Sequence, residues 1–301
     1  MSLYLRMAAL FLVLTGMLML IGYAIGLYFG DPLVFMGLGL VLAGAVNFVS
    51  YYWSDTIVVK LTRAKIIQES DSPILFGTVR SVAQRAGIPM PRVGIVDSQQ
   101  PNAFATGRGP EKAVVVATSG ILNTLDQKEL EAVIGHEIGH VVHRDVFMSS
   151  VAATIAGVIS YIGTIALWST MLGGSRRSGG NPLMLIAAVV LVPLGATFVR
   201  LGISRSFEYN ADEYGAKLTH NPAGLASALE KITAKAKTRP ISGNPRAGGN
   251  GGGPSPATAS LWIINPFKGS SLVEMFSTHP STEHRVERLR KIGEEIGVYV
   301  R

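Results

Sequence analysis

Two histidines and one glutamate lie within five consecutive residues of the chain, as His136, Glu137 and His140. An α-helix has about 3.6 residues per turn, so both imidazoles leave one helix face a turn apart and can bind one divalent cation. Glu137 then lies next to a water molecule on that cation, where its carboxylate can act as a general base. These residue types at this spacing are typical of metal-assisted hydrolysis.

The residues around this motif are apolar or small. Glu137 is the only charged residue between Ala132 and Val142. Two imidazoles and a carboxylate in a buried helix need polar partners, and one metal ion is a partner for all three. The pattern H-E-x-x-H is typical of zinc-dependent peptidases and predicts one Zn²⁺ per chain. A purely structural histidine pair is the alternative interpretation.

A catalytic zinc site needs a third protein ligand, because the fourth position is kept for water or substrate. The chain contains no cysteine, so that ligand is a histidine or a carboxylate. One known arrangement uses a histidine six residues after the motif, but Val146 stands there. The helical segment 206–216 offers a better candidate, Glu208. His143 and Glu213 are weaker alternatives, since we expect each to face away from the other ligands.

Asp212 follows Glu208 by one helical turn. The two carboxylates therefore share a face, so Glu208 can bind zinc while Asp212 accepts the N–H of a ligand histidine and fixes its tautomer. A solvated acidic helix face is the alternative interpretation of this pair.

The composition of the 301-residue chain is typical of a membrane protein, with 48% hydrophobic residues, 16% charged residues and a mean hydropathy of +0.34. Residues 7–29 and 33–53 are uncharged and long enough to cross about 30 Å of hydrocarbon as helices. A Gly-Asp-Pro turn separates them, so they predict a transmembrane hairpin. A cleaved signal peptide is the alternative for the first segment, but its apolar run is long and leads into a second span.

Two further apolar stretches, residues 146–173 and 182–199, predict a second hairpin around the polar turn 174–180. The last stretch is short and contains Pro193, so a half-buried or tilted helix is the alternative there. The predicted parts are a hairpin in 1–55, catalytic residues in 56–145, a hairpin in 146–200 and further catalytic residues in 201–301.

The formal charge of +7 and the isoelectric point near 9.7 come with basic residues beside the predicted spans. Most of these residues would lie on one side of the membrane: Lys60, Arg63, Lys65, Arg144, Arg200 and Arg205. The positive-inside rule makes that side the cytosol, although Arg176 and Arg177 then lie outside. Such charges fix topology and meet anionic lipid, so they need no nucleic-acid partner. We expect a multi-pass protein of the cell membrane with its active site facing the cytoplasm.

The catalytic part mixes helices with short strands. Ser72-Pro73 and Gly87 bound a predicted helix, and Asp126 with Glu129 forms a capping-box-like start for the motif helix. The motif helix can continue almost directly into the third span. Short β-rich runs bounded by Pro and Gly predict a small sheet from residues 92–97, 102–106 and 113–118.

The C-terminal part contains one predicted loop and one predicted helix. Residues 238–260 are rich in Gly, Pro, Ser and Asn, and we expect a mobile loop there. Residues 281–296 return to helical periodicity, with these side chains inward: Val286, Leu289, Ile292 and Ile296.

The order of these features resembles the HtpX family of membrane metalloproteases, which are related to CAAX-prenyl endopeptidases. The features are the leading hairpin, H-E-x-x-H, a second hairpin, Glu208-x-x-x-Asp212, and His279-Pro280 with Arg285. The resemblance covers nearly the whole chain, except that the Gly-rich stretch 248–253 matches nothing in the family pattern. It implies an α-helical integral membrane protein with two transmembrane hairpins and an α+β zincin-like (gluzincin) catalytic domain.

The resemblance also implies an ATP-independent zinc endopeptidase that acts on membrane proteins or unfolded polypeptides in quality control and stress response. It makes Glu208 the third ligand. It further implies that Asn102, Ala103 and Phe104 belong to an edge strand that pairs with substrate backbone, and that His279 and Arg285 lie near the active site, with Arg285 among the residues that bind substrate.

The expected chemistry uses these parts together. Zinc acidifies a water molecule and polarises the scissile carbonyl, while Glu137 takes the water's proton and passes it to the leaving amine. His279 donates to the oxyanion, or else it is only a helix-start residue before Pro280. A catalytically silent metal-binding scaffold and a small transporter are the alternative classes of function. The intact Glu137 argues against the first, and short spans without charges at mid-membrane argue against the second.

Overall fold

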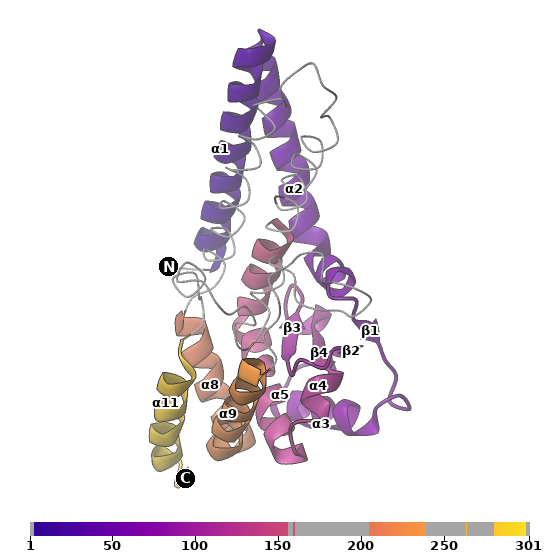
Figure 1. Ribbon diagram of the computed structural model, residues 1–301, viewed down its shortest axis with the longest axis vertical. Helices are drawn as coiled ribbons and strands as arrows, with labels where there is room; N and C mark the ends of the chain where they lie inside the picture. Colours follow the sequence, from indigo (N-terminus) through magenta and orange to yellow (C-terminus); the bar gives the residue numbers. More distant parts are fainter. Residues whose placement is uncertain (1–2, 156–158, 160–204, 239–262, 264–279, 299–301) are drawn as a thin grey trace. The chain divides into compact units, whose positions relative to one another are not determined.

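The structure is a computed structural model, which describes residues 3–155, 159, 205–238, 263 and 280–298 (Figure 1). Its contacts divide the chain into two compact units. The first unit consists of Met1–Ser54 with Val151–Gly202, and the second of Asp55–Ser150 with Ile203–Arg301.

The first unit contains the predicted leading hairpin. Helices α1 (Leu3–Phe29) and α2 (Pro32–Leu61) meet at a turn where Gly30 has φ of 90°. By length and composition, Met7–Leu27 and Pro32–Leu61 can each cross a membrane. The helices approach closely, because a Cβ on Gly22 would lie 2.2 Å from the carbonyl oxygen of Phe35. The prediction of two apolar helices joined by a short turn is therefore confirmed.

The predicted second hairpin lies mostly outside the described residues. Its first part is the apolar helix Asp145–Ile155. A single residue separates that helix from the motif helix α5 (Gln127–His143), since Arg144 adopts a left-handed conformation with φ of 60° and closes α5. The two helices are thus consecutive but not continuous.

The second unit contains a four-stranded sheet. Its strands are β1 (Lys65–Ile66), β2 (Arg92–Val96), β3 (Ala103–Thr106) and β4 (Val114–Thr118), in the order β1-β2-β4-β3. β4 runs parallel to β2 and antiparallel to β3, while β1 pairs antiparallel with β2. Three of these strands were predicted; the two-residue β1 is too short to produce a periodic pattern. β3 is an end strand of the sheet, as the resemblance implies.

Helix α5 is central to the second unit. It packs against α3 (Pro73–Arg85), α8 (Arg205–Thr219), α9 (Pro222–Thr238) and β3, with α8 and α9 on one side and the strands on the other (Figure 1). α11 (Thr282–Glu295) packs on α8 and α9. Short helices α4 (Ser119–Leu122) and η1 (Pro110–Lys112) flank β4. This arrangement buries the motif helix on nearly every side.

The ends of these helices follow from their sequences. At the start of α5, Asp126 accepts from the backbone N–H of Glu129 at 2.9 Å and Glu129 accepts from that of Asp126 at 3.0 Å, which confirms the predicted capping box. Helix α9 has no counterpart among the helices predicted from the sequence. Its signals were Pro222 at the first turn and an apolar stripe, which is buried at Leu225, Ala228, Leu229 and Ile232.

Candidate active site

Helices α5 and α8 bring three metal-binding side chains together. One ligand atom each from His136, His140 and Glu208 lie within 4.8 Å of one another. The Nε2 atom of His136 is 3.8 Å from Oε2 of Glu208, and the Nε2 atom of His140 is 3.5 Å from Oε1. Two imidazole nitrogens and one carboxylate oxygen are the donor set of many catalytic zinc sites. The cluster can therefore hold a metal ion.

Three glycines make this convergence possible, and the sequence analysis missed them. A Cβ on Gly215 of α8 would lie 2.5 Å from the backbone nitrogen of His136, and one on Gly139 of α5 would lie 3.2 Å from Cα of Ala211. A Cβ on Gly135 of α5 would likewise lie 3.2 Å from the backbone oxygen of Gly215. The two backbones therefore approach closely, which lets the carboxylates of α8 reach the imidazoles of α5. The available signal was a pair of small residues four apart in each helix, at 135 and 139 and at 211 and 215.

Asp212 lies against the first ligand histidine. Its Oδ1 atom is 2.9 Å from Nδ1 of His136, and both side chains are buried. Burial lowers the pKa of His136 despite this carboxylate, so the imidazole is held neutral, which is the form that binds a metal. Burial opposes the charge of Asp212, but Arg285 and His136 outweigh it and lower the pKa of that carboxyl. This arrangement has the geometry of the orienting contact proposed from the sequence.

Asp145 lies near the second histidine, and sequence reasoning did not single it out. Its Oδ2 atom is 3.6 Å from Nδ1 of His140. Burial opposes the charged form of His140, but Asp145 and Glu208 offset it and raise the pKa to about 10. A divalent cation competes with that proton, because only neutral imidazole is a ligand. The only signal was an acid directly after the motif helix.

Glu137 lies on the motif helix, where its side chain is buried and accepts a hydrogen bond from the backbone of β3. Burial raises the pKa of its carboxyl to about 7, although a hydrogen bond from the backbone of Ala105 and the charge on His140 favour the ionised form. A carboxyl group that titrates near neutrality can both accept and release a proton at working pH. The position and the chemistry of Glu137 suit a general base.

The remaining predicted residues lie in different places. Asn102 is buried just before β3, and its Oδ1 atom accepts from the backbone N–H of Ile263 at 2.9 Å. Ala103 and Phe104 lie in β3, at the end of the sheet. Arg285 is 1% exposed and forms ion pairs with Asp212 and Glu208. The predicted oxyanion donor His279 lies outside the described residues.

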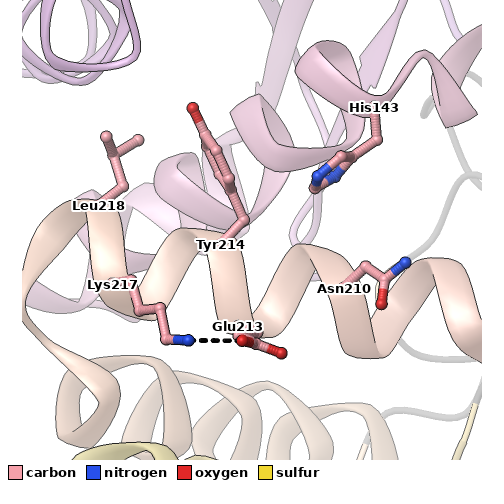
Figure 2. A pocket seen from close by; sticks show the side chains of 6 residues that line it. All are labelled: His143, Asn210, Glu213, Tyr214, Lys217 and Leu218. Carbon is pink, nitrogen blue, oxygen red and sulfur yellow. Dashed lines mark hydrogen bonds and ion pairs between the residues drawn. The ribbon is translucent and has the colours of Figure 1, made fainter. Parts of the chain in front are cut away.

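The two alternative third ligands are not part of the three-ligand cluster. Both line a separate pocket of about 310 Å³, shown in Figure 2, together with Asn210, Tyr214, Lys217 and Leu218. There Glu213 forms an ion pair with Lys217, and the ring of His143 lies edge-on to Tyr214 with 5.3 Å between centroids. Among the described residues, Glu208 is the acid whose carboxylate meets the imidazoles of His136 and His140 in the three-ligand cluster.

The sequence matches known proteases along nearly its whole length. Residues 72–293 match the family model of Peptidase family M48. The "Protease HtpX homolog" of Pyrococcus furiosus is 46% identical over 299 residues, covering 99% of this chain and 98% of that protein. The "Protease HtpX homolog" of Nostoc sp. is 44% identical over 293 residues, covering 96% of each.

The crystal structure of S. mikatae Ste24p also matches, covering 95% of this chain and 65% of that chain, with a TM-score of 0.46 and 18% identity. A likeness at this level supports no further argument. The sequence matches confirm the resemblance found from the motifs. Because the family match spans most of the chain and the relatives align along its length, the chain belongs to Peptidase family M48, among the HtpX proteases.

Proposed function

We propose that this protease is a membrane-bound zinc endopeptidase that hydrolyses peptide bonds in membrane proteins and unfolded polypeptides. One observation carries the proposal: the ligand atoms of His136, His140 and Glu208 converge within 4.8 Å, next to the buried carboxyl of Glu137. The donor set of two imidazoles and one carboxylate suits Zn²⁺ and leaves a fourth position open for reactants.

The roles of the residues follow from this geometry. His136, His140 and Glu208 would hold the ion, and Asp212 would keep Nε2 of His136 free for it by binding Nδ1 at 2.9 Å. When bound, zinc would supply the positive charge that acidifies water and polarises the scissile carbonyl. Glu137 would accept the proton of the attacking water and deliver it to the leaving amine.

Strand β3 suits an extended polypeptide substrate. It pairs with β4 on one side and is an end strand of the described sheet, so its other edge can pair with a substrate backbone. The hydrogen bond from the backbone of Ala105 to the carboxyl of Glu137 supports this role, because it places β3 beside that carboxyl. Substrate chains that lie along β3, beside Ala103 and Phe104, would therefore bring a peptide bond to the catalytic groups.

Removal of the metal tests the function. Purified protein is expected to contain one zinc ion per chain by atomic absorption and to cleave casein. Dialysis against a chelator should abolish cleavage, and stoichiometric Zn²⁺ should restore it, because the carboxylate and imidazoles alone do not activate water. Full cleavage by zinc-free protein would contradict the proposal. Zinc-loaded protein that cleaves nothing would support a silent metal-binding scaffold instead.

We further propose that the active site faces the cytoplasm, since with two transmembrane hairpins most basic residues beside the apolar segments would lie on the same side of the membrane as both halves of the catalytic part. The test places single cysteines at Ser178 and Ser255, which lie outside the described residues, in this cysteine-free chain. An impermeant thiol reagent on intact cells should label position 178 only. Labelling at 255 with protection at 178 would reverse the topology.

A further inference from the structure

Arg285 contacts two acidic residues of the candidate metal site, Asp212 and Glu208. It comes from α11, far along the chain from the motif helix, and it is 1% exposed. Its Nε and one terminal nitrogen donate to the two carboxylate oxygens of Asp212 at 2.8 and 2.6 Å. Its other terminal nitrogen lies 3.2 Å from Oε2 of Glu208. One planar guanidinium thus contacts both Glu208 and Asp212 of α8.

This geometry leaves Oε1 of Glu208 to the metal cluster, while a terminal nitrogen of Arg285 also lies 3.4 Å from Nε2 of His136. Arginine binds Oε2 of Glu208, while Oε1 is the oxygen 3.5 Å from Nε2 of His140. Likewise, Asp212 receives the arginine fork and still lies 2.9 Å from Nδ1 of His136. A guanidinium can do this because its donors form a rigid fork; an ammonium carries the same charge without the fork.

The side chain of Arg285 also connects the metal cluster to β3, the strand proposed to pair with substrate. Its terminal nitrogen donates to the backbone carbonyl of Ile263 at 3.4 Å, and the N–H of Ile263 donates to Oδ1 of Asn102 at 2.9 Å. The backbone carbonyl of Asn102 in turn accepts from the backbone N–H of Thr118, at the start of β3 and the end of β4. A continuous series of hydrogen bonds therefore runs from Asp212 through Arg285 and Ile263 to Asn102, the residue just before β3.

We propose that Arg285 is a positioning residue that orients Glu208 and Asp212 for metal binding and, through Ile263, sets the position of Asn102 at the start of β3. This inference rests on the proposed zinc site. It differs from a direct contact between arginine and substrate, because the donors of Arg285 are engaged by Asp212, Glu208 and Ile263. It also differs from simple charge neutralisation, which any cation at this position would provide.

The test compares R285K with R288K. Lysine keeps the charge but loses the fork. Arg288 lies on the exposed side of the same helix, with its guanidinium 4.5 Å from the ring centroid of Tyr209, and is the matched control. Zinc affinity is measured by competition with a chromogenic chelator. We expect R285K to raise the Kd for zinc by roughly ten- to a hundredfold, as for other groups that orient metal ligands, and R288K to leave it unchanged. Unchanged affinity in R285K would overturn the proposal.

A second variant keeps the test valid if R285K folds poorly. D212N/R285M removes both partners of the buried Asp212–Arg285 pair, so neither of these two charges is left without its partner, although Glu208 also loses its ion pair with Arg285. We expect the double variant to recover the thermal unfolding midpoint of the wild type while its zinc affinity stays low. Recovery of both properties would mean that the pair only neutralises charge.

The branch toward β3 is tested by a double-mutant cycle on KM. N102A should raise KM without changing zinc affinity. At saturating zinc, the effects of N102A and R285K on KM should be non-additive, because both substitutions interrupt the same series of hydrogen bonds. Strictly additive effects would overturn this branch. If the wild-type protein bound no zinc, the proposed function itself would fail. If the wild-type protein were zinc-loaded and active, and R285K had the same zinc affinity, only the role of Arg285 would be refuted.

Discussion

Glu137→Gln is expected to abolish peptide-bond cleavage while zinc remains bound at wild-type stoichiometry. Glutamine keeps the shape of this buried side chain, which is 4% exposed, but cannot accept the proton of the attacking water. Loss of a general base typically lowers the rate by about 10²- to 10⁴-fold. The measurement is kcat/KM on a fluorogenic peptide, with zinc content by atomic absorption on the same sample.

The motif helix offers a matched control for this substitution. Glu129 is also 4% exposed on α5, but it caps the helix and contacts Ser227 and Lys231. Glu129→Gln should retain most of the activity and lose about 1 kcal/mol of stability, as expected for a weakened cap. Near wild-type turnover in Glu137→Gln would refute the proposed mechanism. Equal losses of activity in both variants would point to helix stability instead.

Glu208→Ala should strip the metal and, with it, the activity. Two histidines alone hold zinc poorly, because a stable catalytic site uses three protein ligands. We expect zinc content well below one per chain after dialysis, and a much higher Kd for zinc added back. The fold is checked by circular dichroism, since Arg285 loses one of its two carboxylate partners in this variant.

Glu213→Ala is the control on the same helix. Glu213 was the competing ligand candidate, and the structure pairs it with Lys217 beside a separate pocket. This variant should retain zinc and activity, because a surface ion pair contributes little to stability. If Glu213→Ala lost zinc while Glu208→Ala kept it, the third ligand would have to be reassigned.

Much of this protein follows from local sequence patterns. The H-E-x-x-H spacing defines two ligands and a base because a helix repeats every 3.6 residues or so, and this geometry holds wherever the helix lies. The leading apolar segments, the capping box at Asp126 and the strands around β4 are equally local, because hydrophobic runs, caps and turn residues act on their near neighbours. The family resemblance extended these patterns to the order of motifs along the chain.

Only the tertiary structure decided which distant groups converge. Glu208 and Glu213 are both acids on one helix, and only the close approach at Gly139 and Gly215 directs Glu208, but not Glu213, toward the imidazoles. Asp145 and Arg285 likewise have no periodic signal. Only the family resemblance placed Arg285 near the active site, whereas the helical periodicity of its segment leaves it outside the apolar face; the packing of α11 on α8 buries it against Asp212. Long-range packing determines these contacts because side-chain directions in a helix are fixed locally, whereas the neighbour that each direction meets depends on the whole fold.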